Sequence, residues 1–504
     1  MNANLFDILA RAIPDAGATV IETLDGARIS YGDLVARTGR MANALLALGV
    51  KPDDRVAVQV EKSVEAIILY LATARAGAVF LPLNTGYTAA EIAYFITDAE
   101  PTLFVCDPAR AADLSPAAEK AGARMVTLDA KGQGSLTEAA AAASADFDTV
   151  PRDKDDLAAL LYTSGTTGRS KGAMLTHGNL VSNALTLRET WRYTARDVLI
   201  HALPIFHTHG LFVATNVTLF SGASMIFLPK FEPDRIFALM ARATVLMGVP
   251  TFYVRLLEDD RLNAETTAHM RLFVSGSAPL LAETHRAWQT RTGHAILERY
   301  GMTETNMNTS NPYDGARVAG TVGLPLPGTE VIVTHPETGV ELPLGEIGMI
   351  EVRGANVFKG YWRMPEKTAA ELRANGFFIT GDLGRIDDNG YVHIVGRGKD
   401  LIITGGYNVY PKEIEAEIDE IPGVLESAVI GIAHKDFGEA VTAVVVRTGN
   451  PSLTETAIIA ALEGRLARFK QPKRVLFVPE LPRNTMGKVQ KNLLRDQYAG
   501  LYLK

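Results

Sequence analysis

Apolar and polar positions alternate in a regular rhythm through residues 1–300. Compact apolar runs, such as Arg55–Val60 and Thr102–Cys106, have the length and composition of buried strands. Between them lie longer segments with helical spacing, such as Leu34–Leu48 and Val64–Ala76. Because strand and helix follow one another in turn, we expect an α/β fold whose parallel sheets are covered by helices on both faces.

The pattern changes after residue 320, where glycine and proline become dense and short alternating strands appear. Examples are Glu330–Val333, Gly348–Arg353 and Tyr391–Val395. This pattern predicts an antiparallel, barrel-like subdomain after two parallel-type α/β subdomains. A polar, glycine-flanked segment then precedes a small α+β portion. We therefore predict an N-terminal domain over residues 1–396, a hinge at 397–399 and a C-terminal lid domain over 400–504.

Composition narrows the classes of protein that remain. The chain has 504 residues and a net charge of −7, without a long basic block, which argues against nucleic acid as the main partner. The single cysteine, Cys106, excludes an internal disulfide and a multi-cysteine metal site. No basic region precedes an apolar core at the N-terminus, and the most apolar window, Ala66–Leu83, contains Arg75. We expect a cytoplasmic protein with no membrane partner.

A glycine-rich loop at residues 163–172 is the first candidate site. It follows the apolar run Leu157–Leu161 and contains glycines, hydroxyl side chains and two cations. Glycines allow a ligand to approach the backbone closely, and successive N–H groups bind anions, so the expected ligand is polyphosphate. The loop does not match a Walker motif, because Ser170 stands where that motif needs glycine. A flexible polar surface loop is the alternative interpretation.

Further polar loops could complete a nucleotide site. Residues 275–280 and 300–304 each follow a predicted strand, and the second set could stack a purine, bond a phosphate and hold Mg²⁺. Asp382 could accept both hydroxyls of a ribose, and Arg397 lies between two glycines. Lys488 follows a polar turn and could supply a point charge to a phosphoryl transition state. Taken singly, residues 300–304 and Asp382 are also typical of ordinary turns, and a lone lysine such as Lys488 is more typical of a solvated side chain.

Five motifs in this order resemble the adenylate-forming acyl-CoA synthetase family. They are residues 163–171, 300–304, 380–382, 396–400 and 484–488. The resemblance covers nearly the whole chain and implies a large N-terminal portion, a small C-terminal lid and a hinge between them. It also implies two steps: a carboxylate attacks ATP to give acyl-AMP and pyrophosphate, and the thiol of CoA then displaces AMP.

The resemblance also implies roles for individual residues. The expected cofactors and co-substrates are ATP, Mg²⁺ and CoA. The expected catalytic residues are Lys488, Glu304 and Thr303, with Glu304 and Thr167 at the metal, Lys399 as the hinge, and Gly405 and Gly406 along the CoA tunnel. The expected ATP and AMP contacts are Thr163, Ser164, Gly165, Thr166, Thr167, Gly168, Lys171, Gly276, Ser277, Ala278, Tyr300, Gly301, Met302, Asp382 and Arg397.

The acid pocket is expected near His207 and Ser277. His207 and His209 form a His-x-His pair, which we interpret as a pocket wall rather than a metal site. Arg255 lies one helical turn from Thr251, so it could hold a second carboxylate on the substrate; a surface position is the alternative. Arg286 is the second candidate for that role.

Residues 299–310, with Arg255 and Ser277, look closest to the malonyl-CoA synthetase branch of the family. The sequence therefore predicts malonate activation, with methylmalonate as a secondary substrate. The alternatives are a synthetase for a short-chain or aromatic monocarboxylic acid, an adenylation domain that loads a carrier protein, and a non-enzymatic binding protein. A lysine acyltransferase and a deacylase acting on Lys488 are expected partners. The oligomeric state stays open.

Overall fold

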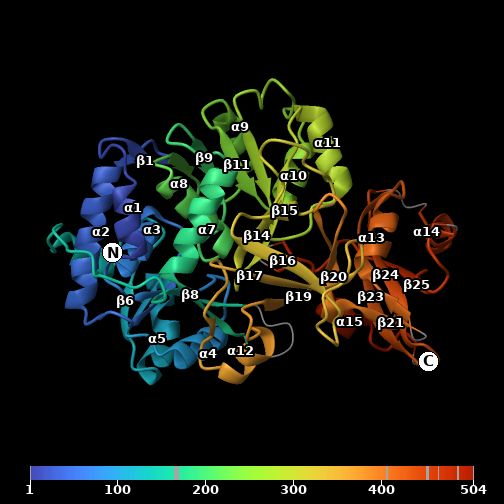
Figure 1. Ribbon diagram of the computed structural model, residues 1–504. Coiled ribbons are helices and arrows are strands. Elements are labelled where there is room, and N and C mark those ends of the chain that lie inside the picture. The colour runs from blue at the N-terminus through green and yellow to red at the C-terminus, as the bar shows by residue number, and fades with distance from the viewer. Residues whose placement is uncertain are drawn as a thin grey trace.

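The computed structural model describes residues 2–163, 170–404, 407–449, 453–463, 465–484 and 487–502. Four sheets and the helices around them make up this part of the chain. Figure 1 shows the N-terminal and central elements side by side, with the C-terminal elements gathered at one end of the molecule next to β20. The expected α/β class with a small C-terminal α+β domain is confirmed.

The first large sheet has seven strands in the order β18-β8-β7-β4-β3-β5-β6. Its strands are β3 (Arg55–Gln59), β4 (Val79–Pro82), β5 (Leu103–Cys106), β6 (Arg124–Thr127), β7 (Leu157–Tyr162), β8 (Gly172–Thr176) and β18 (Gly360–Tyr361). Strands β7, β4, β3, β5 and β6 are parallel, as the βαβ rhythm predicts. Strand β8 pairs antiparallel with β7, and β18 pairs antiparallel with β8. The glycine-rich loop therefore joins two antiparallel strands.

The second large sheet has nine strands in the order β15-β14-β13-β12-β11-β9-β10-β1-β2. Its strands are β1 (Thr19–Thr23), β2 (Arg28–Ser30), β9 (Val198–His201), β10 (Ser224–Phe227), β11 (Val245–Gly248), β12 (Leu272–Ser275), β13 (Leu297–Met302), β14 (Asn306–Ser310) and β15 (Leu324–Pro325). The central strands from β13 to β1 are parallel, while β14, β15 and β2 add antiparallel edges.

Two smaller sheets follow, both mainly antiparallel. The third sheet, in the order β16-β17-β19-β20, contains β16 (Thr329–Thr334), β17 (Gly348–Gly354), β19 (Phe378–Ile386) and β20 (Val392–Arg397). The C-terminal sheet contains β21 (Ile402–Thr404), β22 (Tyr407–Val409), β23 (Val424–His434), β24 (Gly438–Arg447) and β25 (Arg474–Phe477). A short 3₁₀ turn, η3 (Gly398–Asp400), connects them at the position predicted for the hinge.

Helices cover the sheets, and several begin with a capping box at Ser30, Thr88 or Thr176. The helices of the first half are α1 (Leu5–Arg11), α2 (Tyr31–Ala47), α3 (Val64–Arg75), α4 (Ala89–Ala99), η1 (Pro108–Arg110), α5 (Ala111–Lys120), α6 (Ser135–Ala141), α7 (His177–Thr190), η2 (His209–Thr215) and α8 (Asn216–Phe220). Those of the second half are α9 (Pro233–Met240), α10 (Pro250–Leu257), α11 (Ala282–Thr292), α12 (Pro365–Glu371), α13 (Pro411–Asp419), α14 (Glu455–Leu462) and α15 (Lys491–Tyr498).

The largest hydrophobic core joins the two large sheets. Nearly every residue of α3 is buried, and this core contains side chains from β3 and β7 of one sheet and from β9 and β10 of the other. The helix expected around Leu211–Leu219 instead begins as the π-helix η2. There the Gly210 carbonyl oxygen accepts hydrogen bonds from Thr215 (2.9 Å) and from His201 (3.0 Å). Within the described ranges, no helix is long and apolar enough to cross a membrane.

Candidate active site

The two ends of the glycine-rich loop are held together by backbone pairing. Tyr162 pairs with Gly172, and the Thr163 N–H donates to the Lys171 carbonyl oxygen at 2.9 Å. Five of the predicted nucleotide contacts lie outside the described residues, namely Ser164, Gly165, Thr166, Thr167 and Gly168. Lys171 is described, and its ammonium group lies 4.1 Å from the centre of the Tyr361 ring.

Asp382 joins three parts of the chain that are far apart in sequence. Its carboxylate accepts a hydrogen bond of 2.6 Å from the Tyr300 hydroxyl and forms an ion pair of 2.6 Å with Arg397 Nε. Asp382 lies in β19 and pairs with Arg397 in β20, which explains how the two meet. The charge of Asp382 raises the pKa of Arg397 further. The predicted adenine and ribose residues are therefore brought together at one place.

Glu304 lies in the turn between β13 and β14, directly after Thr303. Its side chain is buried, and Glu304 Oε1 lies 3.0 Å from the Tyr361 hydroxyl. Burial raises the pKa of this carboxyl, which indicates that the site lacks enough positive charge to stabilise a carboxylate fully. Over the described part of the chain, no group of three or more His, Cys, Asp or Glu residues could hold a metal. A single carboxylate fits Mg²⁺, which commonly takes few protein ligands and completes its shell with phosphate and water oxygens.

Lys488 approaches this site from the C-terminal domain. The charges of Arg397, Asp382, Lys399 and Asp400 all act on it, and burial lowers its pKa to about 8. The adjacent Gly487 lies close to Thr251, since a Cβ built at Gly487 would be 3.5 Å from Thr251 Cγ2. Gly487 therefore lies against the start of α10.

The predicted hinge lysine lies in η3, and its side chain is exposed. The protein around it removes part of its hydration and so lowers the pKa of Lys399, while the neighbouring charge of Asp400 opposes this shift. Asp400 pairs with Arg495 of α15 at 2.9 Å, which fastens the connection to the C-terminal domain. Gly405 and Gly406, the expected CoA-tunnel residues, lie outside the described residues. The hinge and tunnel assignments stay predictions.

Ser277 and the two histidines meet near the carboxyl ends of β12 and β13. Ser277 has a left-handed backbone (φ 73°), and its Oγ lies 3.2 Å from His209 Nδ1. Burial lowers the pKa of His207 to about 4 and that of His209 well below its usual value, so both rings are neutral at pH 7. The interpretation of this pair as a pocket wall stays a prediction.

Arg299 is the functional candidate that sequence reasoning missed. It lies in β13 and is 3% exposed, and its Nε and Nη2 atoms have no hydrogen-bond partner among the described residues. Burial lowers its pKa to about 9, and its charge acts on His207 and His209. Burial raises the pKa of the neighbouring Glu298 to about 8, which weakens it as a counter-ion at pH 7. A buried arginine in a central strand is itself a signal, since arginine is rarely buried without a partner.

The two arginines that were expected to face the acid lie at the surface. Arg255 is exposed, because the buried face of α10 is formed by Tyr253 and Leu256. This exposure agrees with the surface position that was the alternative for Arg255, and its contact with the acid stays a prediction. Arg286 is also exposed, and it lies 3.8 Å from Glu420 of the C-terminal domain.

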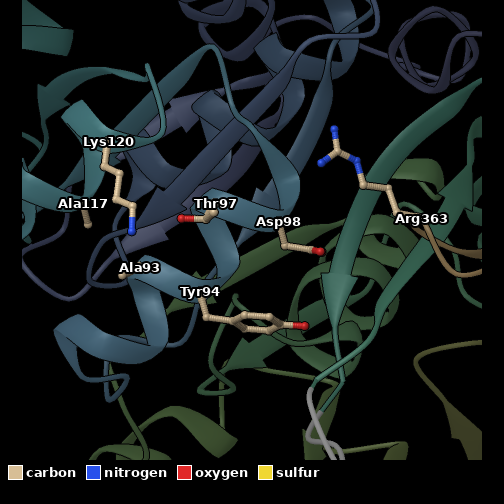
Figure 2. Close-up of a pocket in the computed structure, with 7 residues that line it drawn as sticks. All are labelled: Ala93, Tyr94, Thr97, Asp98, Ala117, Lys120 and Arg363. Atoms are coloured by element: carbon tan, nitrogen blue, oxygen red, sulfur yellow. The ribbon is translucent and has the colours of Figure 1, made fainter.

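A separate cavity of about 410 Å³ lies between α4 and α5, near the glycine-rich loop. Figure 2 shows Tyr94, Thr97, Asp98 and Lys120 around it, with Arg363 on the opposite side. The Tyr94 hydroxyl donates to the Ser170 carbonyl oxygen at 2.8 Å, and Asp98 accepts a hydrogen bond of 2.5 Å from Tyr162. These contacts hold the two ends of the loop in place. None of the predicted site residues lines this cavity.

Two family models match the chain. The AMP-binding enzyme model matches residues 6–362, and the model for the C-terminal domain of AMP-binding enzymes matches residues 413–488. The chain therefore belongs to the AMP-binding enzyme family.

Solved structures and characterised relatives agree with this placement. The chain is 67% identical to MatB from Rhodopseudomonas palustris over 100% of both chains, with a TM-score of 0.98 against the ATP-bound structure and 0.87 against the apo structure. It is 34% identical to a malonate–CoA ligase of Arabidopsis thaliana, covering 94% of this chain and 85% of the relative. It is 36% identical to a feruloyl-CoA synthase of an Amycolatopsis species, covering 94% and 95%. At equal identity, the chain superimposes more closely on the ATP-bound MatB structure than on the apo structure.

Proposed function

We propose that this protein is an ATP-dependent malonate–CoA ligase that also accepts methylmalonate. It forms malonyl-AMP and pyrophosphate, and then malonyl-CoA and AMP. Membership of the AMP-binding enzyme family supports the ligase chemistry, and the similarity to a malonate–CoA ligase supports the acid. The relatives near 35% identity do not by themselves select the acid, because a feruloyl-CoA synthase is as similar as the malonate–CoA ligase, whereas the 67% identity to MatB supports malonate. The choice between these acids also depends on the residues of the acid pocket.

The observation that carries the proposal is the unpaired guanidinium group of Arg299. A buried charge without a partner is costly, because it has lost its hydration and gained nothing in exchange. Two of its nitrogen atoms lack hydrogen-bond partners in the part of the chain that the structure describes, and the nearby histidines are neutral at pH 7. A second carboxylate on the substrate would supply the missing counter-ion and could bind the planar guanidinium through two parallel hydrogen bonds. A ferulate-like acid carries no such group.

The surrounding residues support the adenylation step. In this step an oxygen of the malonate carboxylate bonds to the α-phosphorus of ATP, and the bond from that phosphorus to the β-phosphate oxygen breaks. Lys488 stabilises negative charge that develops on the α-phosphate, and Thr303 contacts the same group. Tyr300 and Asp382 hold adenosine through its base and ribose. Lys171 and the glycine-rich loop hold the pyrophosphate that leaves.

Mg²⁺ would be held by Glu304, with Thr167 as the second expected ligand; when bound, it neutralises phosphate charge. In the second step the thiolate of CoA attacks the acyl carbonyl carbon, a C–S bond forms, and the C–O bond to AMP breaks. The thiol proton is released to solvent. Lys488 must leave the α-phosphate to make room for the thiol, which rotation about Lys399 would achieve.

A substrate panel with three arginine variants tests the proposal. Purified wild type, Arg299→Gln, Arg255→Gln and Arg286→Gln are assayed for CoA-dependent AMP formation with malonate, methylmalonate, acetate, benzoate and ferulate. Removing the proposed counter-ion of a buried carboxylate should lower kcat/KM for malonate by about 100-fold or more in Arg299→Gln. The same variant should lose its preference for diacids over acetate.

The two exposed arginines are matched controls. Arg255→Gln and Arg286→Gln remove the same charge from the surface and should leave malonate kinetics within about twofold of wild type. The proposal fails if wild type prefers a monocarboxylic acid, or if Arg299→Gln retains the malonate KM while Arg255→Gln loses it. AMP release that needs a carrier protein and not CoA would instead favour a carrier-loading domain.

We also propose Lys488 as a target of a lysine acyltransferase and a deacylase. Its pKa near 8 leaves a substantial neutral fraction of this amine at physiological pH, and a neutral amine is the form that attacks an acyl donor. Acylation would remove the charge that adenylation requires. Mass spectrometry after incubation with an acyltransferase and acetyl-CoA should show modification at Lys488 together with loss of activity. An unmodified Lys488 in an inactivated sample would contradict this.

A further inference from the structure

Lys171, the phosphate-holding lysine, is already paired inside the protein. Its ammonium nitrogen lies 3.2 Å and 3.4 Å from the two carboxylate oxygens of Glu371, and 3.1 Å from the Tyr361 hydroxyl. Both members of the ion pair are largely shielded, with side-chain exposures of 20% and 22%. Glu371 therefore competes with polyphosphate for the positive charge of Lys171.

The local fold explains why these side chains meet. Lys171 immediately precedes β8, and β18 pairs with β8 so that Tyr361 lies opposite Ala173. The chain then turns into α12, whose last residue is Glu371, and α12 packs against β18. A partner for Lys171 thus comes from about two hundred residues further along the chain, through pairing that is independent of any nucleotide.

Glu371 has two other partners that do not involve Lys171. Lys367, one turn earlier in α12, lies 2.7 Å from Glu371 Oε1, and the Tyr361 hydroxyl lies 2.6 Å from Glu371 Oε2. Although burial opposes it, the hydrogen bonds from Lys367 and Tyr361 and the charge of Lys171 lower the pKa of Glu371. If Lys171 turns away, the Glu371 carboxylate still has Lys367 and the Tyr361 hydroxyl as partners. Loss of Lys171 therefore does not leave a buried charge unpaired.

We propose that Glu371 is an exchangeable counter-ion of Lys171, which polyphosphate displaces on binding and which recaptures Lys171 when pyrophosphate leaves. The inference rests on the proposed adenylation function. It makes Glu371 a residue that positions Lys171 for the pyrophosphate that leaves. In the free enzyme Glu371 keeps Lys171 in place. In the loaded enzyme it competes for the same cation, which lowers the affinity for pyrophosphate and favours release of that product.

The direction in which the affinity for polyphosphate changes when Glu371 is replaced separates this role from a structural one. Pyrophosphate and the triphosphate of ATP are strongly anionic, so a carboxylate close to their binding lysine opposes their binding by Coulomb repulsion and by occupying the lysine. Removing the carboxylate charge should therefore strengthen binding. If Glu371 only supported the fold around Lys171, its removal would loosen that lysine and weaken binding. The charged groups that bear on this balance are Lys171, Lys367 and Glu304.

Equilibrium binding tests the exchange without any acid or CoA. Titration calorimetry measures the Kd of magnesium pyrophosphate and of magnesium ATP for wild type and Glu371→Gln, which keeps the shape of the side chain and removes its charge. We expect both ligands to bind about threefold to tenfold more tightly to Glu371→Gln, the range that removal of one competing ion pair would produce. Unchanged or weaker binding would overturn the proposal.

The chain offers a matched control and a second variant. Glu366, an exposed glutamate on the same helix, is replaced in Glu366→Gln, which should leave both Kd values unchanged. Glu371→Asp retains the charge and should bind pyrophosphate with an affinity between those of wild type and Glu371→Gln. Should Glu371→Gln fail to fold, as judged by circular dichroism, Glu371→Ala takes its place with the same expected sign.

Turnover then connects the exchange to product release. With malonate, ATP and CoA, pyrophosphate should inhibit Glu371→Gln at about threefold to tenfold lower concentration than it inhibits wild type. Failure of the proposed function and of this inference give different results. If wild type activates no malonate but Glu371→Gln binds pyrophosphate more tightly, the exchange stands and the substrate assignment falls. If malonate is activated but the binding of pyrophosphate does not tighten, only the exchange falls.

Discussion

The guanidinium group of Arg299 occupies the space that a side chain at Gly276 would need. A Cβ built at Gly276 would lie 2.6 Å from Arg299 Nε, closer than real Cβ atoms approach their neighbours. Gly276 is followed by Ser277, whose hydroxyl contacts His209. The absence of a side chain at Gly276 is thus what allows Arg299 to reach the carboxyl end of β12 beside these residues.

Gly276→Ala should therefore impair malonate binding. The added methyl group forces Arg299 out of position, and overpacking of this kind costs about 1–3 kcal/mol. We expect the KM for malonate to rise about tenfold or more, while the KM for ATP changes by less than about threefold, because the methyl group points at Arg299. Steady-state kinetics with each substrate varied in turn measures both constants.

A glycine without close neighbours serves as the control for this substitution. Gly17 has only the Asp15 carboxylate within 4 Å of a built Cβ, at 3.4 Å, so Gly17→Ala should leave both constants unchanged. A larger effect of Gly276→Ala on ATP than on malonate would show that Gly276 serves the nucleotide instead.

Lys488→Ala should separate the two half-reactions. Loss of the cation near Asp382 and Arg397 removes transition-state charge stabilisation, which is typically worth a factor of about 10² to 10³ in rate. Malonate-dependent exchange of pyrophosphate into ATP should fall by that factor. Formation of malonyl-CoA from supplied malonyl-AMP should stay within about threefold of wild type, since Lys488 is not used there.

The exposed lysine Lys435, also in the C-terminal domain, provides the comparison. Lys435→Ala should behave as wild type in both half-reactions. Equal loss of both half-reactions in Lys488→Ala would instead indicate that Lys488 holds the domain arrangement rather than the α-phosphate.

Adenylation should weaken in alkaline solution because Lys488 acts as a cation. Its pKa of about 8 means that it is protonated below pH 8 and loses its charge as the pH rises through that value. Burial and the charges of Arg397 and Lys399 lower this pKa, while Asp382 and Asp400 oppose them. We expect kcat/KM for ATP, measured by pyrophosphate exchange at saturating malonate, to fall about tenfold per pH unit above pH 8.

Other groups titrate in the same range and need to be separated from Lys488. Glu298 and Arg299 have pKa values of about 8 and about 9, and both lie on the acid side of the site. Saturating malonate suppresses their influence on the ATP constant. In Lys488→Arg, whose guanidinium stays protonated, the residual activity should lose the alkaline decline. An unchanged decline in that variant would assign it to another group.

Sequence reasoning predicts the architecture well because the fold depends on local patterns. The parallel strands β3, β4 and β5 are visible as compact apolar runs, and their pairing follows from the helices between them. The π-helix at His209–Thr215 is different: it depends on the Gly210 carbonyl accepting bonds from both His201 and Thr215. No sequence pattern indicates that convergence.

The acid site shows where such reasoning fails. Arg255 fits the helical spacing from Thr251, but that spacing does not say which face of α10 is buried, and the buried face belongs to Tyr253 and Leu256. Arg299 precedes the Tyr300 motif and is easily interpreted as part of it. The importance of Arg299 depends on two properties: it is buried without a counter-ion among the described residues, and it lies close to Gly276. The spacing of residues along the sequence reveals neither property.

The antiparallel pairing of β7 and β8 has a consequence for evolution and design. In a strand–loop–helix arrangement, phosphate binding uses the helix N-terminus, so altering the loop disturbs a helix that packs on the sheet. Here the loop connects the two strands of one hairpin. The hydrogen bond from the Thr163 N–H to the Lys171 carbonyl oxygen closes it. Changes of loop length or composition can therefore be accommodated without moving either strand. We therefore expect the proposed phosphate-binding loop to be modular, and transplanting residues 164–170 between relatives should alter nucleotide affinity while the fold is preserved.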